Sequence, residues 1–208
     1  MLSVNKNLII QNFQFNQPVG YHFESTRRVA QLQNKPLRKA SVLIGFVDRP
    51  NGLYVVLTRR AKHLKHHPGQ ISFPGGKYED SDTSLQYTAL REANEEIGLK
   101  PGQVEVLGQM PELVTISRFS VTPIVGLIDP NYSAVLDPNE VDEAFEVPAQ
   151  HLLDRGKLFS HTFKVNQQNH RVFAIPYKRH FIWGMTAQII EAMQKHINPN
   201  NLNIQDLV

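Results

Sequence analysis

Three glutamates within residues 91–99 are the strongest chemical signal in this sequence. The segment reads Arg-Glu-Ala-Asn-Glu-Glu-Ile-Gly-Leu. On a helix that turns about 100° per residue, Glu92 and Glu96 lie about 40° apart, and Glu95 lies about 60° to the other side of Glu92. The three carboxylates would therefore share one face, opposite an apolar stripe that includes Ala93 and Ile97.

As a purely structural arrangement, this crowding of carboxylates is unfavourable. Like charges repel at spacings of three and four residues, and the last turn of a helix prefers cations. A divalent cation such as Mg²⁺ or Mn²⁺ reverses the argument, because clustered carboxylate oxygens are the ligands it requires. For the glutamates alone, a solvated acidic face paired with Arg91 and nearby lysines remains the simpler explanation.

A glycine-rich turn stands shortly before this segment, at Phe73-Pro74-Gly75-Gly76. Proline holds Phe73 extended, and two glycines allow backbone amides and carbonyls to approach a ligand or metal closely. A tight loop is the plain alternative for the turn by itself. Followed by a three-glutamate helix, however, the turn resembles the Nudix box of nucleoside-diphosphate-linked pyrophosphohydrolases.

The resemblance to the Nudix box is complete in its second half. The fixed positions of that half are matched by Arg91, Glu92, Glu95, Glu96 and Gly98. The first half departs from the pattern, because the residue six positions after Gly76 is Asp82 instead of glutamate, and one extra residue precedes Arg91. The role of Asp82 is therefore open.

Residues 56–76 resemble the additional signature of the coenzyme A pyrophosphatase branch of the Nudix family. The match covers Leu57, Thr58, Arg60, Ala61, Gly69 and residues 73–76. Val56 replaces a leucine, and Lys65 replaces an arginine, which keeps the charge but loses the bidentate fork. Similarity to this branch extends over most of residues 38–190.

The resemblance implies a set of site residues. It implies that Mg²⁺ or Mn²⁺ is held by Glu92, Glu95 and Glu96 with the carbonyl of Gly76. It also implies catalytic roles for Glu95, Glu92 and Arg91, with Arg91 orienting the glutamates, and substrate contacts from Arg59, Arg60, Lys65 and Gly75. Glu95, Glu140 and Glu143 are all candidates for the general base, and ordinary acids at a helix start are the alternative for Glu140 and Glu143.

The implied reaction is metal-dependent hydrolysis of the pyrophosphate bond of coenzyme A or its derivatives. Its products are 4′-phosphopantetheine and adenosine 3′,5′-bisphosphate. A Nudix hydrolase of ADP-ribose, NADH, a dinucleotide or a nucleoside triphosphate is the first alternative. A non-catalytic nucleotide-binding Nudix module is the second, although such a module would be expected to lose one or more of the glutamates.

Charge and composition agree with an anionic small-molecule partner. The 208 residues carry 22 Lys and Arg against 19 Asp and Glu, a formal net charge of +3. Segment 59–67 alone contains four of those cations and no acid, which favours phosphate contacts over a solvated loop. A zinc site at its three histidines is disfavoured by the neighbouring cations. The absence of cysteine excludes a disulfide framework, a cysteine zinc site and a thiol nucleophile.

The elements that must position these residues can be predicted from pattern. We expect a buried strand over 40–47, a turn over 48–52, a hairpin partner over 53–58, and a helix over 83–97 ended by Gly98. Further strands are predicted over 104–107, 121–128 and 172–175, with a short helix over 24–33. An amphipathic helix is predicted over 183–197, with Trp183 packed in the core.

These elements predict an α/β (α+β) fold, and the resemblance implies a Nudix-like α/β/α sandwich with a mixed β-sheet between helices. We expect a single domain over 1–208, with an N-terminal arm or helix over 1–37, a core over 38–197 and a tail over 198–208. The expected partner is a coenzyme A-type nucleotide, without nucleic acid or membrane. A homodimer is possible, and the expected location is the cytoplasm, because no targeting segment is recognised.

Overall fold

The computed structural model describes residues 4–14, 36–165 and 168–198. The predicted helix over 24–33 and residues 199–208 of the predicted tail lie outside these ranges. The helices of the described ranges are α1 (Lys6–Gln14), α3 (Leu85–Ile97), α4 (Ala149–Leu153) and α5 (Met185–Ile197), with short 3-10 helices η1 (Pro101–Gln103) and η2 (Arg155–Lys157).

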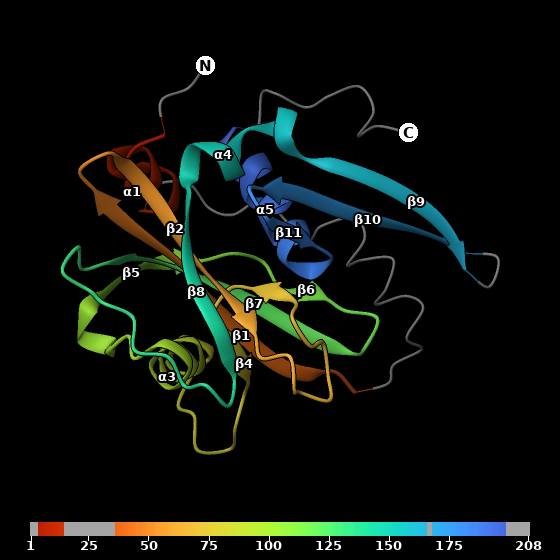
Figure 1. The fold of residues 1–208 in the computed structure, drawn as a ribbon, viewed down its shortest axis with the longest axis horizontal. Coiled ribbons are helices and arrows are strands. Elements are labelled where there is room, and N and C mark those ends of the chain that lie inside the picture. The colour runs from red at the N-terminus through yellow and green to blue at the C-terminus, as the bar shows by residue number, and fades with distance from the viewer. Residues whose placement is uncertain (1–3, 15–35, 166–167, 199–208) are drawn as a thin grey trace.

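A large mixed sheet forms the centre of the molecule (Figure 1). Its strands are β1 (Arg38–Arg49), β2 (Gly52–Arg60), β3 (Ile71–Ser72), β4 (Gly75–Lys77), β5 (Val104–Gln109), β6 (Leu113–Val114), β7 (Phe119–Ile128) and β8 (Val141–Pro148). The strand order along its main path is β3-β2-β1-β7-β5, with β4 paired to β1, β6 to β7 and β8 to β2. β1 and β7 run parallel, and the other pairs are antiparallel.

Side chains along the central strands point alternately to the two faces of the sheet, so the core has two layers. On β1, Leu43 and Val47 pack with α3, whereas Ile44 and Phe46 pack with the opposite layer. This opposite layer contains buried residues from α1, α4 and α5, including Ile9, Leu152 and Ile190. Because both faces of the strands are buried, β1 and β7 read as nearly continuous apolar runs. The predicted fold, a mixed sheet between helices, is confirmed.

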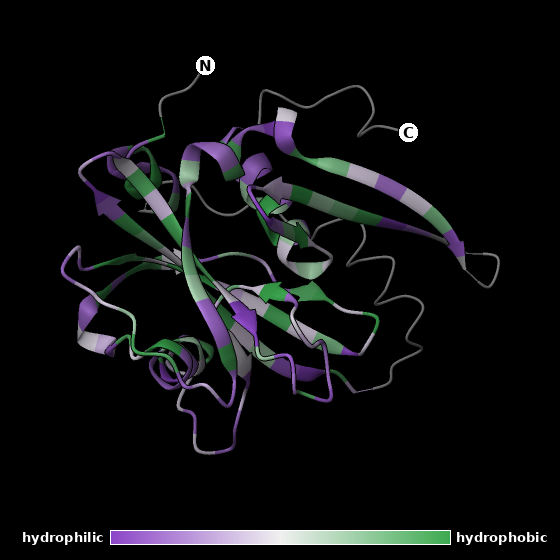
Figure 2. Ribbon diagram, in the orientation of Figure 1, coloured by the Kyte–Doolittle hydropathy of each residue, from purple (hydrophilic) through white to green (hydrophobic). Residues whose placement is uncertain are grey.

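A second sheet lies beside the α5 layer. It is an antiparallel sheet with the order β11-β10-β9, built from β9 (Phe159–Val165), β10 (Gln168–Tyr177) and β11 (His180–Trp183). A hydrogen bond from the hydroxyl of Thr186 on α5 to the carbonyl of Ile71 on β3 (2.9 Å) ties this part of the chain to the large sheet. In Figure 2, β6 and β11 are coloured as hydrophobic, whereas the loop before α3 is hydrophilic.

Most predicted elements are present with longer or slightly shifted bounds. The hairpin over 40–58 is β1 and β2, joined with Phe46 opposite Val55, and the helix over 83–97 is α3. The strands predicted over 104–107, 121–128 and 172–175 lie in β5, β7 and β10. None of the helices in the described ranges combines the length and apolar character needed to cross a membrane.

The prediction for Trp183 was wrong. Trp183 is the last residue of β11, and α5 begins two residues later at Met185. Along β11 the side chains alternate, so Ile182 is buried and Trp183 is 46% exposed. Because a strand alternates with period two, a residue next to a buried one faces outward, which helical periodicity did not anticipate.

Candidate active site

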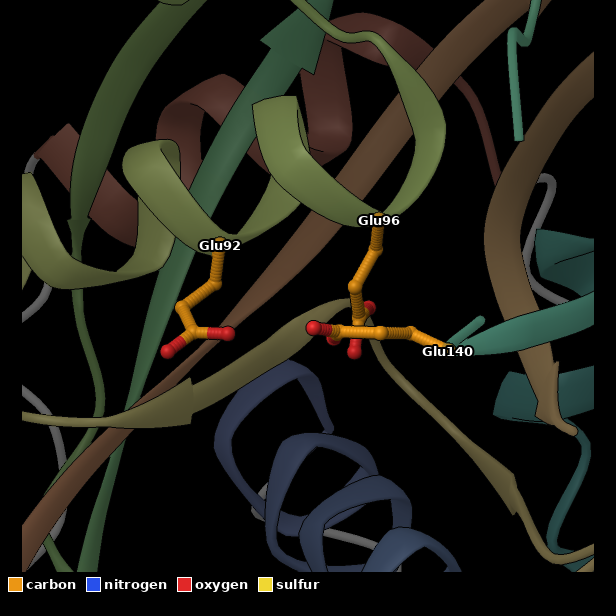
Figure 3. Close-up of side chains that lie close together, drawn as sticks. All are labelled: Glu92, Glu96 and Glu140. Carbon is orange, nitrogen blue, oxygen red and sulfur yellow. The ribbon is translucent and has the colours of Figure 1, made fainter. Parts of the chain in front are cut away.

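Three carboxylates converge beside α3 (Figure 3). Glu92 and Glu96 project from α3, and Glu140 projects from the turn that precedes β8. One oxygen of each lies within 4.8 Å of the corresponding oxygens of the other two. Within the residues that the structure describes, this is the one group of at least three His, Cys, Asp or Glu side chains with such spacing. We call Glu92, Glu96 and Glu140 the acid cluster.

Local sequence fixes the helix that carries two members of the acid cluster. Ser84 caps the start of α3, where its hydroxyl accepts a hydrogen bond from the backbone N–H of Tyr87 (3.0 Å). Gly98 ends the helix in a left-handed conformation with φ 69°, as predicted, and its N–H donates to the carbonyl of Asn94 (2.9 Å). The spacing of four residues then places Glu92 and Glu96 on one face.

The glycine turn lies directly against the acid cluster. The backbone N–H of Gly75 donates to Oε2 of Glu96 at 3.3 Å. A Cβ on Gly76 would stand 2.4 Å from the carboxylate of Glu92, so the carboxylate occupies the space that any side chain there would need. Gly75 has φ +153°, and a Cβ on it would stand 2.4 Å from the carbonyl oxygen of Ser41. Glycine is therefore required at both positions of the turn. At Gly76 a side chain would displace the carboxylate of Glu92, and at Gly75 it would collide with the backbone of Ser41.

Burial makes the acid cluster electrostatically costly. Glu96 is 1% exposed, and this burial raises its pKa to about 8, although the Gly75 N–H and the charge of Arg60 act in the opposite direction. Burial likewise raises the pKa of Glu92, against the lowering effect of Arg91. The charge of Glu140 contributes to raising both values. Desolvated carboxylates that repel one another are stabilised by a cation placed among them.

Arg91 is held in place by several acceptors beside the acid cluster. Its guanidinium donates to both carboxylate oxygens of Asp82 (2.9 and 3.1 Å) and to the carbonyl of Lys77 (3.0 Å). It also donates to Glu95 (2.8 Å) and Glu92 (3.2 Å). Arg91 therefore contacts two of the glutamates that it is expected to orient, and that role stays a prediction.

Asp82 is a buried anchor for Arg91. It is 3% exposed, and it accepts further hydrogen bonds from the hydroxyl of Thr88 (2.8 Å) and the N–H of Glu79 (3.0 Å). The Arg91 guanidinium is the largest cause that lowers the pKa of Asp82 to about 2. The aspartate thus keeps a bidentate pair with Arg91, despite the extra residue between them in the sequence.

Glu95 is not part of the acid cluster. Its side chain is 52% exposed, and one of its oxygens binds Arg91. The sequence grouped it with Glu92 and Glu96 because the three share a broad helix face. Glu140 takes the third place instead, because the turn before β8 brings it to α3. The assignment of Glu95 as a metal ligand stays a prediction.

Residues 59–67, which we call the basic segment, begin on β2 and continue into the loop before β3. Arg60 accepts a backbone hydrogen bond from Gly69 (3.1 Å) and donates its own N–H to Gln70 (3.0 Å), which closes this loop. The next residue, Ala61, donates its N–H to the carbonyl of Glu140 (2.9 Å). The basic segment is therefore attached to the residue that completes the acid cluster.

The other residues of the basic segment for which the sequence predicted a substrate or metal contact lie in different surroundings. Lys65 lies on the exposed part of the loop, and Arg59 forms an ion pair with Glu143 (2.8 Å). The ring of His63 is 3.1 Å from the carbonyl of Asn139, and His66 and His67 are exposed. These histidines do not form a metal site of the kind described above for the acid cluster.

Sequence reasoning placed Glu143 on a loop or at a helix start, and this was wrong. Glu143 lies in β8, opposite Arg59 of β2. It also pairs with Arg179 (2.5 Å), from the turn between β10 and β11, and with His180 (3.3 Å), the first residue of β11. Neither of those residues was singled out, although the basic run Lys178-Arg179-His180 was a visible signal.

Comparison with known proteins relates the sequence of this chain to one family. The NUDIX domain model covers residues 37–167. The chain belongs to the Nudix hydrolase family. It is 41% identical over 165 residues to "Uncharacterized Nudix hydrolase NudL" of Escherichia coli O7:K1, covering 78% of this chain and 85% of the relative. The NudL protein of Salmonella dublin is 41% identical over 174 residues, covering 81% of this chain and 90% of that protein.

A solved structure supports the fold. The NUDIX domain of NrtR from Shewanella oneidensis, crystallised with ADP-ribose, superposes with a TM-score of 0.50 at 18% identity, covering 81% of this chain and 97% of that one. Its membership of the family, and not this likeness in fold, makes the chain an enzyme, a Nudix pyrophosphohydrolase that acts on a small-molecule substrate. Nudix hydrolases generally use divalent metal ions.

The residues present fit such an ion. The acid cluster supplies only carboxylate oxygens, the donors that hard divalent cations prefer. Burial raises the pKa of its buried member, Glu96, to about 8, so the surrounding protein only partly stabilises the carboxylate form that a cation would bind. Glu92, Glu96 and Glu140 would hold the ion, close to the backbone of the glycine turn.

Proposed function

We propose that this Nudix hydrolase cleaves the pyrophosphate bond of coenzyme A or its derivatives, using Mg²⁺ or Mn²⁺. The observation that carries the proposal is the contact of segment 57–76 with the acid cluster. That segment resembles the coenzyme A pyrophosphatase signature. It meets the cluster near both ends, through Ala61 at Glu140 and through Gly75 at Glu96.

The proposed substrate suits the charge arrangement. Coenzyme A carries a pyrophosphate bridge and a 3′-phosphate, so its recognition calls for cations beside a metal-binding acid cluster. Arg60 at the end of β2 is near enough to lower the pKa of Glu96, and Lys65 lies on the loop that follows. We assign Arg59, Arg60, Lys65 and the Gly75 backbone to substrate binding.

The proposed reaction is attack of water on one phosphorus of the bridge. The bond from that phosphorus to the bridging oxygen breaks, which yields 4′-phosphopantetheine and adenosine 3′,5′-bisphosphate. A bound divalent ion would neutralise phosphate oxygens and lower the pKa of a coordinated water. Arg91 orients Glu92 and Glu95, and the glycine turn admits the pyrophosphate close to the backbone.

Two of the three candidates for the general base remain. Burial alone would raise the pKa of Glu143, but hydrogen bonds from Arg179 and His180 and the charge of Arg59 lower it overall. A carboxylate with a lowered pKa and two guanidinium partners is a weak proton acceptor. Glu95 and Glu140 are therefore the candidates that we retain.

A parallel assay tests the substrate. The purified protein is incubated with Mg²⁺ or Mn²⁺ and with coenzyme A, ADP-ribose, NADH and nucleoside triphosphates, and products are separated by chromatography. We expect kcat/KM to be highest for coenzyme A or its acyl or oxidised forms. A clear preference for any other substrate class would overturn the proposal.

A further inference from the structure

A cluster of cations lies on the sheet beside the candidate active site. Glu143 of β8 forms ion pairs with Arg59 of β2 at 2.8 Å and with Arg179 at 2.5 Å. His180, stacked on the ring of Phe145 at 3.8 Å between centroids, approaches the same carboxylate at 3.3 Å. Two permanent cations thus share one carboxylate, which leaves positive charge uncompensated.

Several hydrogen-bond donors of this cluster remain available. Among the described residues, Nε of Arg59 is a buried donor without a hydrogen-bond partner, and Oε2 of Glu143, 2.8 Å from Nη1 of Arg59, is ion-paired without a hydrogen bond. The side chain of Arg179 is 73% exposed, and a guanidinium has five N–H donors, most of which the bond to Glu143 does not use. Buried donors without partners are uncommon in native proteins and indicate a missing acceptor.

Glu143, at the centre of the cation cluster, is close in the chain to the acid cluster. Glu143 follows Glu140 by three residues, which in extended chain is about 10 Å. Arg59 precedes Arg60 and Ala61, and Ala61 is hydrogen-bonded to Glu140. A ligand with one anionic group at the acid cluster would thus meet Arg59 and Arg179 with a second anionic group about one sugar away.

We infer that Arg59 and Arg179 form a subsite for a phosphomonoester of the substrate. In the proposed substrate this group is the 3′-phosphate of coenzyme A, so the inference rests on the proposed function. The 3′-phosphate and the pyrophosphate are carried by the same ribose, which suits the separation of the two clusters. A guanidinium group can bind a phosphate through two parallel N–H···O hydrogen bonds. The ion pairs with Glu143 hold the side chains of Arg59 and Arg179 in place for such binding.

Dephospho-coenzyme A, which lacks the 3′-phosphate, is the probe for this subsite. The variant Arg179→Gln removes the most exposed cation, so we expect its kcat/KM for coenzyme A to fall about tenfold or more, mainly through KM. Its kcat/KM for dephospho-coenzyme A should change less than about twofold. Arg179→Lys, which keeps the charge, should recover part of the loss.

Lys178→Gln is the matched control, because it removes a positive charge from the neighbouring position of the same turn. It should leave both substrates unaffected. An equal loss with both substrates in Arg179→Gln, or no loss with either, would overturn the subsite. If the unmodified protein hydrolyses neither coenzyme A nor its dephospho form, the proposed function fails, and the subsite is then decided by inhibition.

Inhibition gives a second measurement that does not require turnover of coenzyme A. Adenosine 3′,5′-bisphosphate and AMP differ by the 3′-phosphate alone. With any substrate that the protein hydrolyses, the bisphosphate should inhibit the unmodified protein more strongly than AMP does. Arg179→Gln should remove most of that difference, and a difference that survives unchanged contradicts the assignment.

Discussion

At Glu96, burial and charge oppose each other more strongly than at any other residue of the acid cluster. The side chain is 1% exposed, and its pKa is raised to about 8 by that burial. A buried carboxyl group with a raised pKa contributes little to the stability of the fold in the absence of a cation. The arrangement is understandable if its charge is used in metal binding.

Replacing Glu96 with glutamine should therefore separate activity from stability. We expect turnover to fall by about 10²–10³-fold, because a ligand of the divalent ion that would neutralise the reacting phosphates is lost. The melting temperature of the metal-free protein should be unchanged or higher, since a neutral amide is less costly to bury. Steady-state kinetics and thermal denaturation check this. Near-normal hydrolysis by Glu96→Gln would contradict its role.

Replacing Glu95 with glutamine distinguishes two possible sets of metal ligands, one with Glu140 and one with Glu95 as the third carboxylate. If Glu92, Glu96 and Glu140 hold the ion, Glu95→Gln should bind Mn²⁺ with nearly unchanged affinity in a calorimetric titration, whereas Glu140→Gln should bind it more weakly. The reverse order would favour the set implied by sequence resemblance, in which Glu95 is a ligand.

Asp82 should act on stability through Arg91. The variant Asp82→Asn loses charge-assisted hydrogen bonds to the partly buried guanidinium of Arg91, so the free energy of unfolding should fall by about 1–3 kcal/mol. Asp80→Asn, at an exposed position of the same loop, should have almost no effect. Chemical denaturation measures both, and equal effects would show that Asp82 is not a specific anchor.

The pH dependence of stability should carry the signature of Asp82. Its pKa is lowered from 3.8 to about 2 in the folded protein, mainly by Arg91. The stabilisation is therefore present above pH 4 and is lost as the pH falls from about 4 to about 2. The difference in unfolding free energy between the unmodified protein and Asp82→Asn should shrink over that range. A constant difference would contradict the assignment.

At the scale of the element, the glycine turn offers a matched pair of substitutions. In Gly76→Ala, the new Cβ meets the end of a flexible side chain, Glu92, which can move away. We expect a small change in melting temperature and a large loss of turnover, because the carboxylate is displaced. In Gly75→Ala, the new Cβ meets the backbone of Ser41, and φ is +153°.

Gly75→Ala should therefore be strongly destabilised, by several kcal/mol, because neither the backbone nor the dihedral angle can adjust cheaply. Measuring the melting temperature and the turnover of both variants tests the pair. A stable, inactive Gly76→Ala beside an unstable Gly75→Ala is the expected result. Equal melting temperatures would contradict the different neighbours assigned to the two glycines.

At the scale of the whole molecule, metal binding should raise stability. An ion that binds the folded chain alone adds free energy that grows with its concentration, about 2.7 kcal/mol at a hundredfold excess over Kd. We expect Mg²⁺ or Mn²⁺ to raise the melting temperature and a chelator to reverse the rise. Glu96→Gln, compared at equal ionic strength, should show a much smaller response. An equal response would place the ion elsewhere.

Several expectations for the whole molecule stay predictions. These are the single domain over 1–208 with its arm and tail, the homodimer and the cytoplasmic location. The proposed substrate and metal have their own tests above. The family, the mixed sheet between helices and the hydrolase class are established by the fold and the comparisons.

The parts of the site whose residues are close in the chain could be predicted from sequence patterns. Glu92 and Glu96 share a helix face because four residues make about one turn, and Gly98 ends that helix because its backbone is left-handed. The buried hairpin of β1 and β2 could be read from its apolar runs. The pairing of Asp82 with Arg91 was left open, because a loop of unusual length separates them.

Which distant residues meet depends on how the strands and turns pack in the folded chain. Glu140 replaced Glu95 in the acid cluster because the backbone of Ala61 holds the turn before β8 against the end of β2. Arg59, Glu143 and Arg179 come from three separate strands or turns, so no spacing in the sequence relates them. Local periodicity specifies one helix or strand, whereas strand pairing across the sheet selects the partners that complete a site.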